Sequence, residues 1–474
     1  MNMATSFLNF EDYAKTLIEE FKLPGASIGI AKGGELVYEK NIGFRDPAGE
    51  LPITIDTVFG IGSITKSMTC VAIMQLQEAG KLSVHDSVVT YLPEFRIRGS
   101  EWTEKMTIHH LMTHSTGLPP LPTLFNATQR SMMEDKESLE NEDYKEIATL
   151  KPIDTYEELL DFIAELEIEL LGEPGVEFSY SNDSYALLGA IIERVSGQLY
   201  EVYMRENILE PIGMINSVFL PQELDQLQEV APLYTPRKTK DGTEVVYSPN
   251  WWESPVMRAA GFLKSTVRDM LRYIEIFRLH GSMENTQILS ADSVAEMIKP
   301  HMQVDRDRFY GYGLAVTPNY HGVTMIEHGG GIKGVAAQIF FTPEHSLTGV
   351  VLTNLDGGPS KQLMIGALNS LQGRHMDALP GTYYDYPLEK ECISDYFGRY
   401  ESGEGEKVEI RMEGESLVLV CGEDSYPLRS VAEDSFIFIR GRLNVAIRFI
   451  RNASQTVHRL SYGSRQLAKM SLHS

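Results

Sequence analysis

One predicted helix constrains the fold of this chain more than any other stretch. After Gly62-Ser63-Ile64-Thr65-Lys66-Ser67, apolar residues continue on most faces of the helix as far as Gly80. A helix of this kind lies inside a domain, so we expect Ser63 at the mouth of a buried central helix. With 474 residues, of which 43% are hydrophobic, the chain can form such a core, and two domains are expected.

Ser63 and Lys66 form a Ser-x-x-Lys pair at the start of this helix. Residues three apart share a helix face, so the lysine can be the base that a serine nucleophile needs. The first N–H groups of the helix can face a developing negative charge. Lys66 must then be neutral part of the time, which burial or a neighbouring cation can arrange. The alternative is a chance match in a solvated turn.

Phe178-Ser179-Tyr180-Ser181-Asn182 is a second polar segment, predicted to lead from an aromatic strand into an apolar helix over 185–195. Tyr180 and Asn182 can point into a cleft, and a phenol near a lysine can pass protons as its pKa falls. Packing by the tyrosine and helix capping by the asparagine are the alternatives.

Glu327-His328-Gly329-Gly330-Gly331 is a third polar segment, between predicted strands over 323–326 and 335–341. Glycines let a ligand approach the backbone, and N–H groups at a strand edge can bind an oxyanion. His328 would add a polar, sometimes cationic, head near a bound carbonyl. The alternative is a plain glycine hairpin.

Two other regions are candidates for the border of a site. Trp251 and Trp252 lie in an irregular polar stretch and either form a pocket wall or serve in packing. Residues 131–170 contain fourteen Asp or Glu and three Lys, a net charge of −11, around an amphipathic helix near 159–166. We expect an insertion over about 119–170 that forms a mobile acidic lid or rim, or else a solvated decoration without a role.

Charge and targeting signals narrow the function classes. The formal net charge of −24 disfavours nucleic acid and membrane surfaces as partners. The N-terminus predicts an amphipathic helix over 10–21 rather than a secretory signal, and no apolar run approaches a membrane span. We therefore expect a soluble, cytoplasmic protein.

Neither the cysteines nor the histidines predict a metal or disulfide framework. Cys70 is expected in the core, and Cys392 and Cys421 are expected as reduced thiols, with a disulfide between them as the alternative. The group His109, His110 and His114 lacks a carboxylate or thiolate at ligand spacing. We expect these histidines to pack and cap, and no metal is expected.

The last part of the chain predicts a separate domain. A linker over 374–390 precedes short alternating stretches at 407–411, 416–421, 435–440, 444–451 and 456–462. Their spacing near ten residues predicts a small antiparallel barrel or sandwich. We expect this domain to cap the cleft or to mediate self-association into a homo-oligomer.

The three polar segments occur in one order, Ser-x-x-Lys, Tyr-x-Asn and His-x-Gly. Together with Phe59–Lys66 and Met112–Leu118, they resemble the serine β-lactamase and penicillin-binding protein superfamily over about residues 10–372. The chain looks like class C β-lactamase-like hydrolases of the S12 peptidase type, a branch that includes D-aminopeptidases, D,D-peptidases and esterases.

The resemblance implies an α/β (α+β) fold. Residues 1–380 would form an antiparallel sheet flanked by helices, with an all-helical subdomain. Residues 390–474 are similar to a lipocalin-like barrel, with Tyr396–Glu401 as its first strand.

The resemblance also implies the roles of single residues. Ser63 would be the acylated nucleophile, Lys66 its base, and Tyr180 a proton shuttle. Asn182 would hold the substrate amide, and the N–H groups of Ser63 and Gly331 would bind the oxyanion. The full set of expected substrate-binding and oxyanion-binding residues is Asn182, His328, Gly330, Gly331, Trp251 and Trp252.

The implied activity is that of a serine hydrolase without a cofactor, acting on amide or ester bonds of small molecules or short peptides. We expect a peptidase or amidase of the D-aminopeptidase or D,D-peptidase type, and an esterase is the main alternative. A β-lactamase, an acyltransferase and a non-catalytic binding protein are further alternatives. His328-Gly329-Gly330 stands where the family commonly has Lys-Thr-Gly, which disfavours a β-lactamase.

Overall fold

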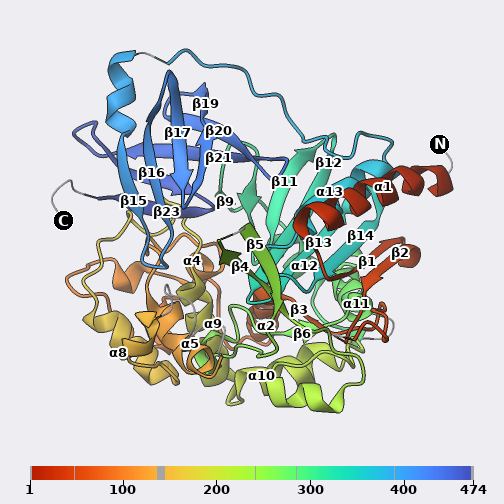
Figure 1. The fold of residues 1–474 in the computed structure, drawn as a ribbon. Helices are drawn as coiled ribbons and strands as arrows, with labels where there is room; N and C mark the ends of the chain where they lie inside the picture. The colour runs from red at the N-terminus through yellow and green to blue at the C-terminus, as the bar shows by residue number, and fades with distance from the viewer. Residues whose placement is uncertain are drawn as a thin grey trace.

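The computed structural model describes residues 3–46, 48–135, 145–240, 242–283, 286–388 and 390–470. An eight-stranded antiparallel sheet with helices on both sides forms the larger part of the molecule, and a nine-stranded antiparallel sheet follows it (Figure 1). The predicted mixture of helices and antiparallel sheet, followed by an all-β unit, is confirmed.

The large sheet has the strand order β2-β1-β14-β13-β12-β11-β10-β9. The predicted hairpin near the N-terminus is present, and its turn uses Gly33 and Gly34 at φ values of 60° and 89°, which suit glycine. The strands are β1 Gly25–Lys32, β2 Glu35–Gly43, β9 Met302–Gln303, β10 Phe309–Tyr310, β11 Ala315–Tyr320, β12 Val323–Ile332, β13 Val335–Thr342 and β14 Leu347–Thr353.

Alternating side chains place a hydrophobic core on each face of this sheet. Ile28 and Val351 pack against α1 (Met3–Phe21) and α13 (Ser360–Leu371), which lie together in Figure 1. Val350 and Leu352 belong to the larger core on the other face, with α2 (Thr65–Glu78) and α11 (Val267–Arg278). The helix that follows Ser63 is therefore central.

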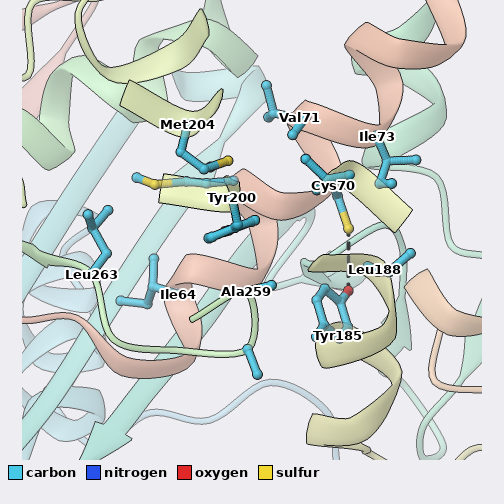
Figure 2. Close-up of a cluster of buried hydrophobic side chains, with 14 of the residues drawn as sticks. Ile64, Cys70, Val71, Ile73, Tyr185, Leu188, Tyr200, Met204, Ala259 and Leu263 are labelled. Carbon is cyan, nitrogen blue, oxygen red and sulfur yellow. Dashed lines mark hydrogen bonds between the residues drawn. The ribbon is translucent and has the colours of Figure 1, made fainter. Parts of the chain in front are cut away.

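Helix α2 is buried as predicted. It packs among α9 (Asn182–Ser196) and α10 (Tyr200–Met204), with Cys70 beside Tyr185 (Figure 2). The Cys70 thiol lies 3.4 Å from the Tyr185 hydroxyl, which donates a 2.8 Å hydrogen bond to the Met112 carbonyl. This packing fixes the helix start at which Ser63 lies.

The predicted insertion is packed into the helical part. Leu159, Leu160 and Ile163 of α8 (Tyr156–Glu165) are buried in the main core, so this helix is more than a solvated decoration. Helix α5 (Thr123–Met133) precedes it. Residues 136–144 lie outside the described residues, and the prediction of a mobile lid is not addressed there.

The remaining helices and short strands connect these layers. They are α3 Val88–Tyr91, α4 Ile108–Met112, α12 Ala291–Met297, β3 Phe59–Gly60, β4 Tyr234–Thr239, β5 Gly242–Tyr247, β6 Lys264–Ser265, β7 Ser282–Met283 and β8 Thr286–Gln287.

The C-terminal sheet curls into a nearly closed barrel with the order β18-β17-β16-β15-β23-β22-β21-β20-β19. Tyr400, Leu419, Phe436, Phe449 and Leu460 belong to its own core. Its strands are β15 Gly398–Glu401, β16 Lys407–Glu413, β17 Ser416–Cys421, β18 Asp424–Pro427, β19 Arg429–Ala432, β20 Ser435–Arg440, β21 Leu443–Arg451, β22 Val457–Tyr462 and β23 Arg465–Lys469. Strands β18, β19 and β23 were not predicted.

Two further observations concern the sequence predictions. Cys70 and Cys421 are free thiols, while the side chain of Cys392 lies outside what the structure describes. Within the described ranges, we find no helix with both the length and the apolar character that crossing a lipid bilayer requires.

Candidate active site

Ser63 and Lys66 meet at the start of α2. Ser63 lies in a short 3-10 turn, Gly62–Ile64, and the Lys66 Nζ atom is 3.1 Å from its Oγ. Lys66 also donates to Asn182 Oδ1 at 2.8 Å and to the Ala260 carbonyl at 2.5 Å. Both of these oxygens can only accept. A neutral amine would give them its two protons and direct its lone pair at Ser63.

The surroundings of Lys66 favour that neutral form. Its side chain is fully buried, and burial is the largest cause that lowers its pKa well below the ordinary value. The nearby Arg465 cation lowers this pKa further, and Glu404 opposes the shift. The arrangement is that of a base facing an alcohol.

Tyr180 is the third group at this point. It forms a side-chain hydrogen bond with Ser63, and its ring centroid is 4.9 Å from Lys66 Nζ. The ring also packs against the tilted ring of His114, at a centroid distance of 4.2 Å. The expected fall in the pKa of Tyr180 is wrong: burial raises this pKa, so the phenol keeps its proton near neutral pH.

The backbone before Tyr180 differs from the prediction. Residues 178–180 form an extended loop and no strand. The reason is that the Tyr180 N–H donates to the carbonyl of Ser464 in the barrel, at 2.8 Å, instead of pairing within a sheet. The loop is therefore held by the barrel.

Asn182 is held at both ends of its amide. Its Oδ1 accepts from Lys66 at 2.8 Å, and its Nδ2 donates to Glu404 Oε1 at 2.9 Å. The expected role of Asn182 was to bind the substrate amide. One of its two N–H groups instead contacts Glu404 in this structure, which leaves one for a ligand.

The glycines of β12 allow this strand to approach the Ser63 turn. A Cβ at Gly62 would lie 2.6 Å from the Gly331 nitrogen, and Gly62 also has a φ of 50°. A Cβ at Gly330 would lie 1.9 Å from the Ile61 carbonyl oxygen. Gly331 borders the same cavity as Ser63, whereas Gly330 serves the close packing of the strand.

The protonation state of His328 differs from the expectation of a sometimes cationic side chain. Its Nδ1 lies 2.6 Å from the Gly329 carbonyl, so this nitrogen carries the proton, and its Nε2 accepts from the Tyr310 hydroxyl at 2.9 Å. Burial first, and the Lys66 charge second, lower the pKa of His328 to about 3. The ring is neutral, because its burial penalises the charged form.

A cavity of about 240 Å³ opens beside Ser63. Trp252 lines it and donates a 2.9 Å hydrogen bond to Asp135, while Trp251 packs at Gly60, where a Cβ would lie 3.4 Å from its ring. Its other lining residues include Leu124, Phe125, Thr128 and Met132 of α5, together with Met257, Phe262, Ile332, Lys333 and Arg465. The predicted insertion thus contributes a wall of the site.

Among the residues that the sequence analysis missed at this site is an ion pair from the barrel. Glu404 lies between β15 and β16, Arg465 begins β23, and the two form an ion pair that reaches the cavity from the barrel. The available signal was weak: both are polar residues at glycine-containing turns, Gly403-Glu404-Gly405 and Gly463-Ser464-Arg465.

The nearby histidines pack and cap, as predicted. His110 completes a capping box with Thr107 at the start of α4. The Nδ1 atom of His109 lies 2.8 Å from the Tyr312 hydroxyl, and His114 Nδ1 accepts from the Ser181 N–H at 3.1 Å.

Comparison with known proteins gives the family of this chain. Residues 10–371 match the Beta-lactamase family, and the chain therefore belongs to it. Members of this family are typically serine hydrolases.

Particular relatives extend the likeness into the barrel. Penicillin-binding protein 4* of Bacillus subtilis (strain 168) is 24% identical over 453 residues, which cover 92% of each chain. The octameric penicillin-binding protein homologue from Pyrococcus abyssi is 30% identical, with a TM-score of 0.69, over 99% of this chain and 100% of that one. A D-stereospecific amidohydrolase from Streptomyces sp. has a TM-score of 0.57 and 24% identity, over 73% of this chain and 93% of its own, and shows the shared fold.

Proposed function

We propose that this chain hydrolyses amide bonds of small peptides or peptide-like substrates through a covalent acyl-enzyme on Ser63. The observation that carries the proposal is the set of three contacts of Lys66, which leaves the lone pair of a neutral amine for Ser63. Family membership and the names of the penicillin-binding relatives support the same chemistry.

In the proposed acylation, Lys66 takes the hydroxyl proton while Ser63 Oγ attacks the substrate carbonyl carbon. The oxyanion accepts hydrogen bonds from the N–H groups of Ser63 and Gly331, which border the cavity. As the C–N bond breaks, Tyr180 donates its proton to the departing amine.

In the proposed deacylation, water attacks the ester and gives one proton to the Tyr180 phenolate. The Lys66 ammonium returns its proton to Ser63 Oγ as that oxygen leaves. Each group ends in its starting form.

The protonated phenol favours amides over esters. An amine is a poor leaving group unless it receives a proton, whereas a phenolate or activated alkoxide can leave without one. Since burial raises the pKa of Tyr180, this proton is present at neutral pH.

A fluorophosphonate probe and three substrate classes test the proposal. The probe should label Ser63, as located by mass spectrometry, and D-aminoacyl or L-aminoacyl anilides should be cleaved. A p-nitrophenyl ester and a chromogenic cephalosporin, assayed in parallel, measure esterase and β-lactamase activity. Labelling away from Ser63, or cleavage of esters with no cleavage of anilides, would contradict the proposal.

Self-association is a second part of the proposal. The octameric state named for the Pyrococcus abyssi homologue supports the expectation that this chain forms a homo-oligomer, and we propose the barrel as the contact surface. Light scattering of the full chain at micromolar concentration should give a mass above that of one chain, and a monomer would contradict it.

A further inference from the structure

Two turns of the barrel reach the Ser63 cleft. One, between β15 and β16, carries Glu404, and the other leads from β22 into Arg465. Besides the bond from the Tyr180 N–H to the Ser464 carbonyl, the Gln466 N–H donates to Ser179 Oγ at 3.2 Å. The barrel therefore contacts the segment that carries Tyr180 and Asn182.

A continuous path of polar contacts runs from the barrel to the nucleophile. Arg465 pairs with Glu404, and Glu404 accepts from Asn182 Nδ2 at 2.9 Å. Asn182 Oδ1 in turn accepts from Lys66 at 2.8 Å, and Lys66 lies 3.1 Å from Ser63. The Glu404 side chain is only 7% exposed, so water screens these charges weakly.

We propose that Glu404 and Arg465 are positioning residues of the active site, which orient Asn182 and balance the charge around Lys66 from the barrel domain. The barrel is then part of the catalytic unit. This inference rests on the proposed function, because it assigns the pair to acyl transfer at Ser63.

The charges around Lys66 determine how the pair would act. Arg465 lowers the pKa of Lys66 and Glu404 raises it. The other titratable side chains that face the amine, from α2, α9, β12 and the loops before α9, are Cys70, His114, Tyr180, Asp183, Tyr185 and His328.

Most of these groups are neutral near pH 7. Burial raises the pKa values of Cys70, Tyr180 and Tyr185, and it lowers those of the two histidines. Burial also raises the pKa of Asp183 to about 7, so its carboxyl is only partly ionised there. The Glu404–Arg465 pair is therefore the main source of full charge near the amine.

The test measures how fast the fluorophosphonate probe labels Ser63 in the full-length protein, across pH. Labelling should slow as the pH falls through the pKa of Lys66, since the protonated amine is no base. Arg465→Gln removes a cation and should move this acid limb to higher pH, by at least about half a pH unit. Glu404→Gln removes an anion and should move the limb to lower pH by a similar amount.

Further variants provide controls. Arg465→Lys keeps the charge, so its acid limb should shift from that of the wild type by less than about half of the shift in Arg465→Gln. Arg429→Gln, at an exposed arginine of the same barrel that pairs with Asp385, should leave the limb unchanged. Melting temperatures check that each variant is folded.

Opposite shifts in the two Gln variants support the inference. The inference is overturned if labelling slows equally at every pH with no shift of the acid limb, or if both variants shift the limb in the same direction. A pair with a merely structural role would give these results. If Arg465→Gln does not fold, the near-isosteric Glu404→Gln decides by itself: a limb that stays in place overturns the inference. A wild-type protein that the probe does not label at Ser63 would contradict the proposed function instead.

Discussion

Two cavities lie near Tyr180, and they differ in what they offer a substrate. The first, of about 240 Å³, includes Ser63 and is walled largely by apolar side chains from α5 and by Trp252. The second, of about 210 Å³, is bordered by Tyr180 and contains His328 with charged Arg308, Glu327 and Lys361.

The charges of the second cavity already have partners. Lys361 Nζ lies 3.3 Å from Glu327 Oε1, and Arg308 donates to Ser464 Oγ at 3.2 Å. The first cavity combines Ser63, the proposed nucleophile, with walls that are largely apolar apart from Lys333 and Arg465. This contrast predicts that an apolar part of the substrate binds in the first cavity, next to Ser63.

Removing the nucleophile from the first cavity should have the largest effect. We expect Ser63→Ala to lower kcat by at least ~100-fold, the low end for removing an acting group. Anilide turnover measures this. Ser67→Ala is the matched control, since Ser67 Oγ faces the Ile64 carbonyl and Tyr273 inside the domain, and it should keep activity within about threefold. Turnover retained in Ser63→Ala would remove the first cavity as the reaction site.

Replacing the base should cost nearly as much. Lys66→Arg places a permanent cation there, because the guanidinium cannot lose its proton, so we expect a loss of ~100-fold or more in kcat/KM. In the wild type, kcat/KM should fall as the pH drops through the lowered pKa of Lys66. A pH–rate profile from pH 4.5 to 9 measures this limb. Activity that rises toward low pH would contradict the role of Lys66.

A charge placed in the wall of the first cavity should change substrate preference. We expect Leu124→Asp to lower kcat/KM roughly tenfold for substrates with six-carbon acyl groups relative to acetyl substrates. A longer acyl group buries more methylenes, each of which contributes about 0.8 kcal/mol, and a carboxylate in the wall removes part of this contribution. Val304→Asp makes the same change in the wall of the second cavity and should leave this ratio within about twofold. If only Val304→Asp alters the preference, the two cavities have been assigned the wrong way round.

The smallest effect on activity is expected in the second cavity. Lys361→Met removes the partner of Glu327, which still accepts from Gln338 at 2.9 Å. We expect kcat/KM within about threefold of wild type, and a free energy of unfolding lower by about 1–2 kcal/mol. Kinetics and urea unfolding measure the two quantities. A tenfold loss of activity at full stability would show that the second cavity takes part in the reaction.

Local patterns in the sequence predicted much of the fold. The β1–β2 hairpin follows from two short apolar strands around Gly33-Gly34, and α2 and α9 follow from their apolar faces. Strands β18 and β19 were missed because they have only four residues each, too few for a clear alternation.

The sequence predicted those residues of the candidate site that lie close together in the chain or match a family motif. Ser63 and Lys66 share one helical turn, so their spacing alone brings them together. Neighbouring residues show the limit of such reasoning. Trp252 lines the cavity while Trp251 packs at Gly60, and the sequence does not say which of two adjacent side chains faces a pocket.

By itself, the sequence determined the candidates for nucleophile and base, the polar segments beside them and the all-β character of the C-terminal part, because these depend on short-range spacing and hydrophobic pattern. Only the tertiary structure decided that Glu404 and Arg465, more than 220 residues beyond Asn182, complete the same site. Contacts of that kind depend on how two packed domains meet, and no local propensity encodes that geometry. The neutral state of His328 was decided in the same way, since the burial that lowers its pKa exists only in the folded chain.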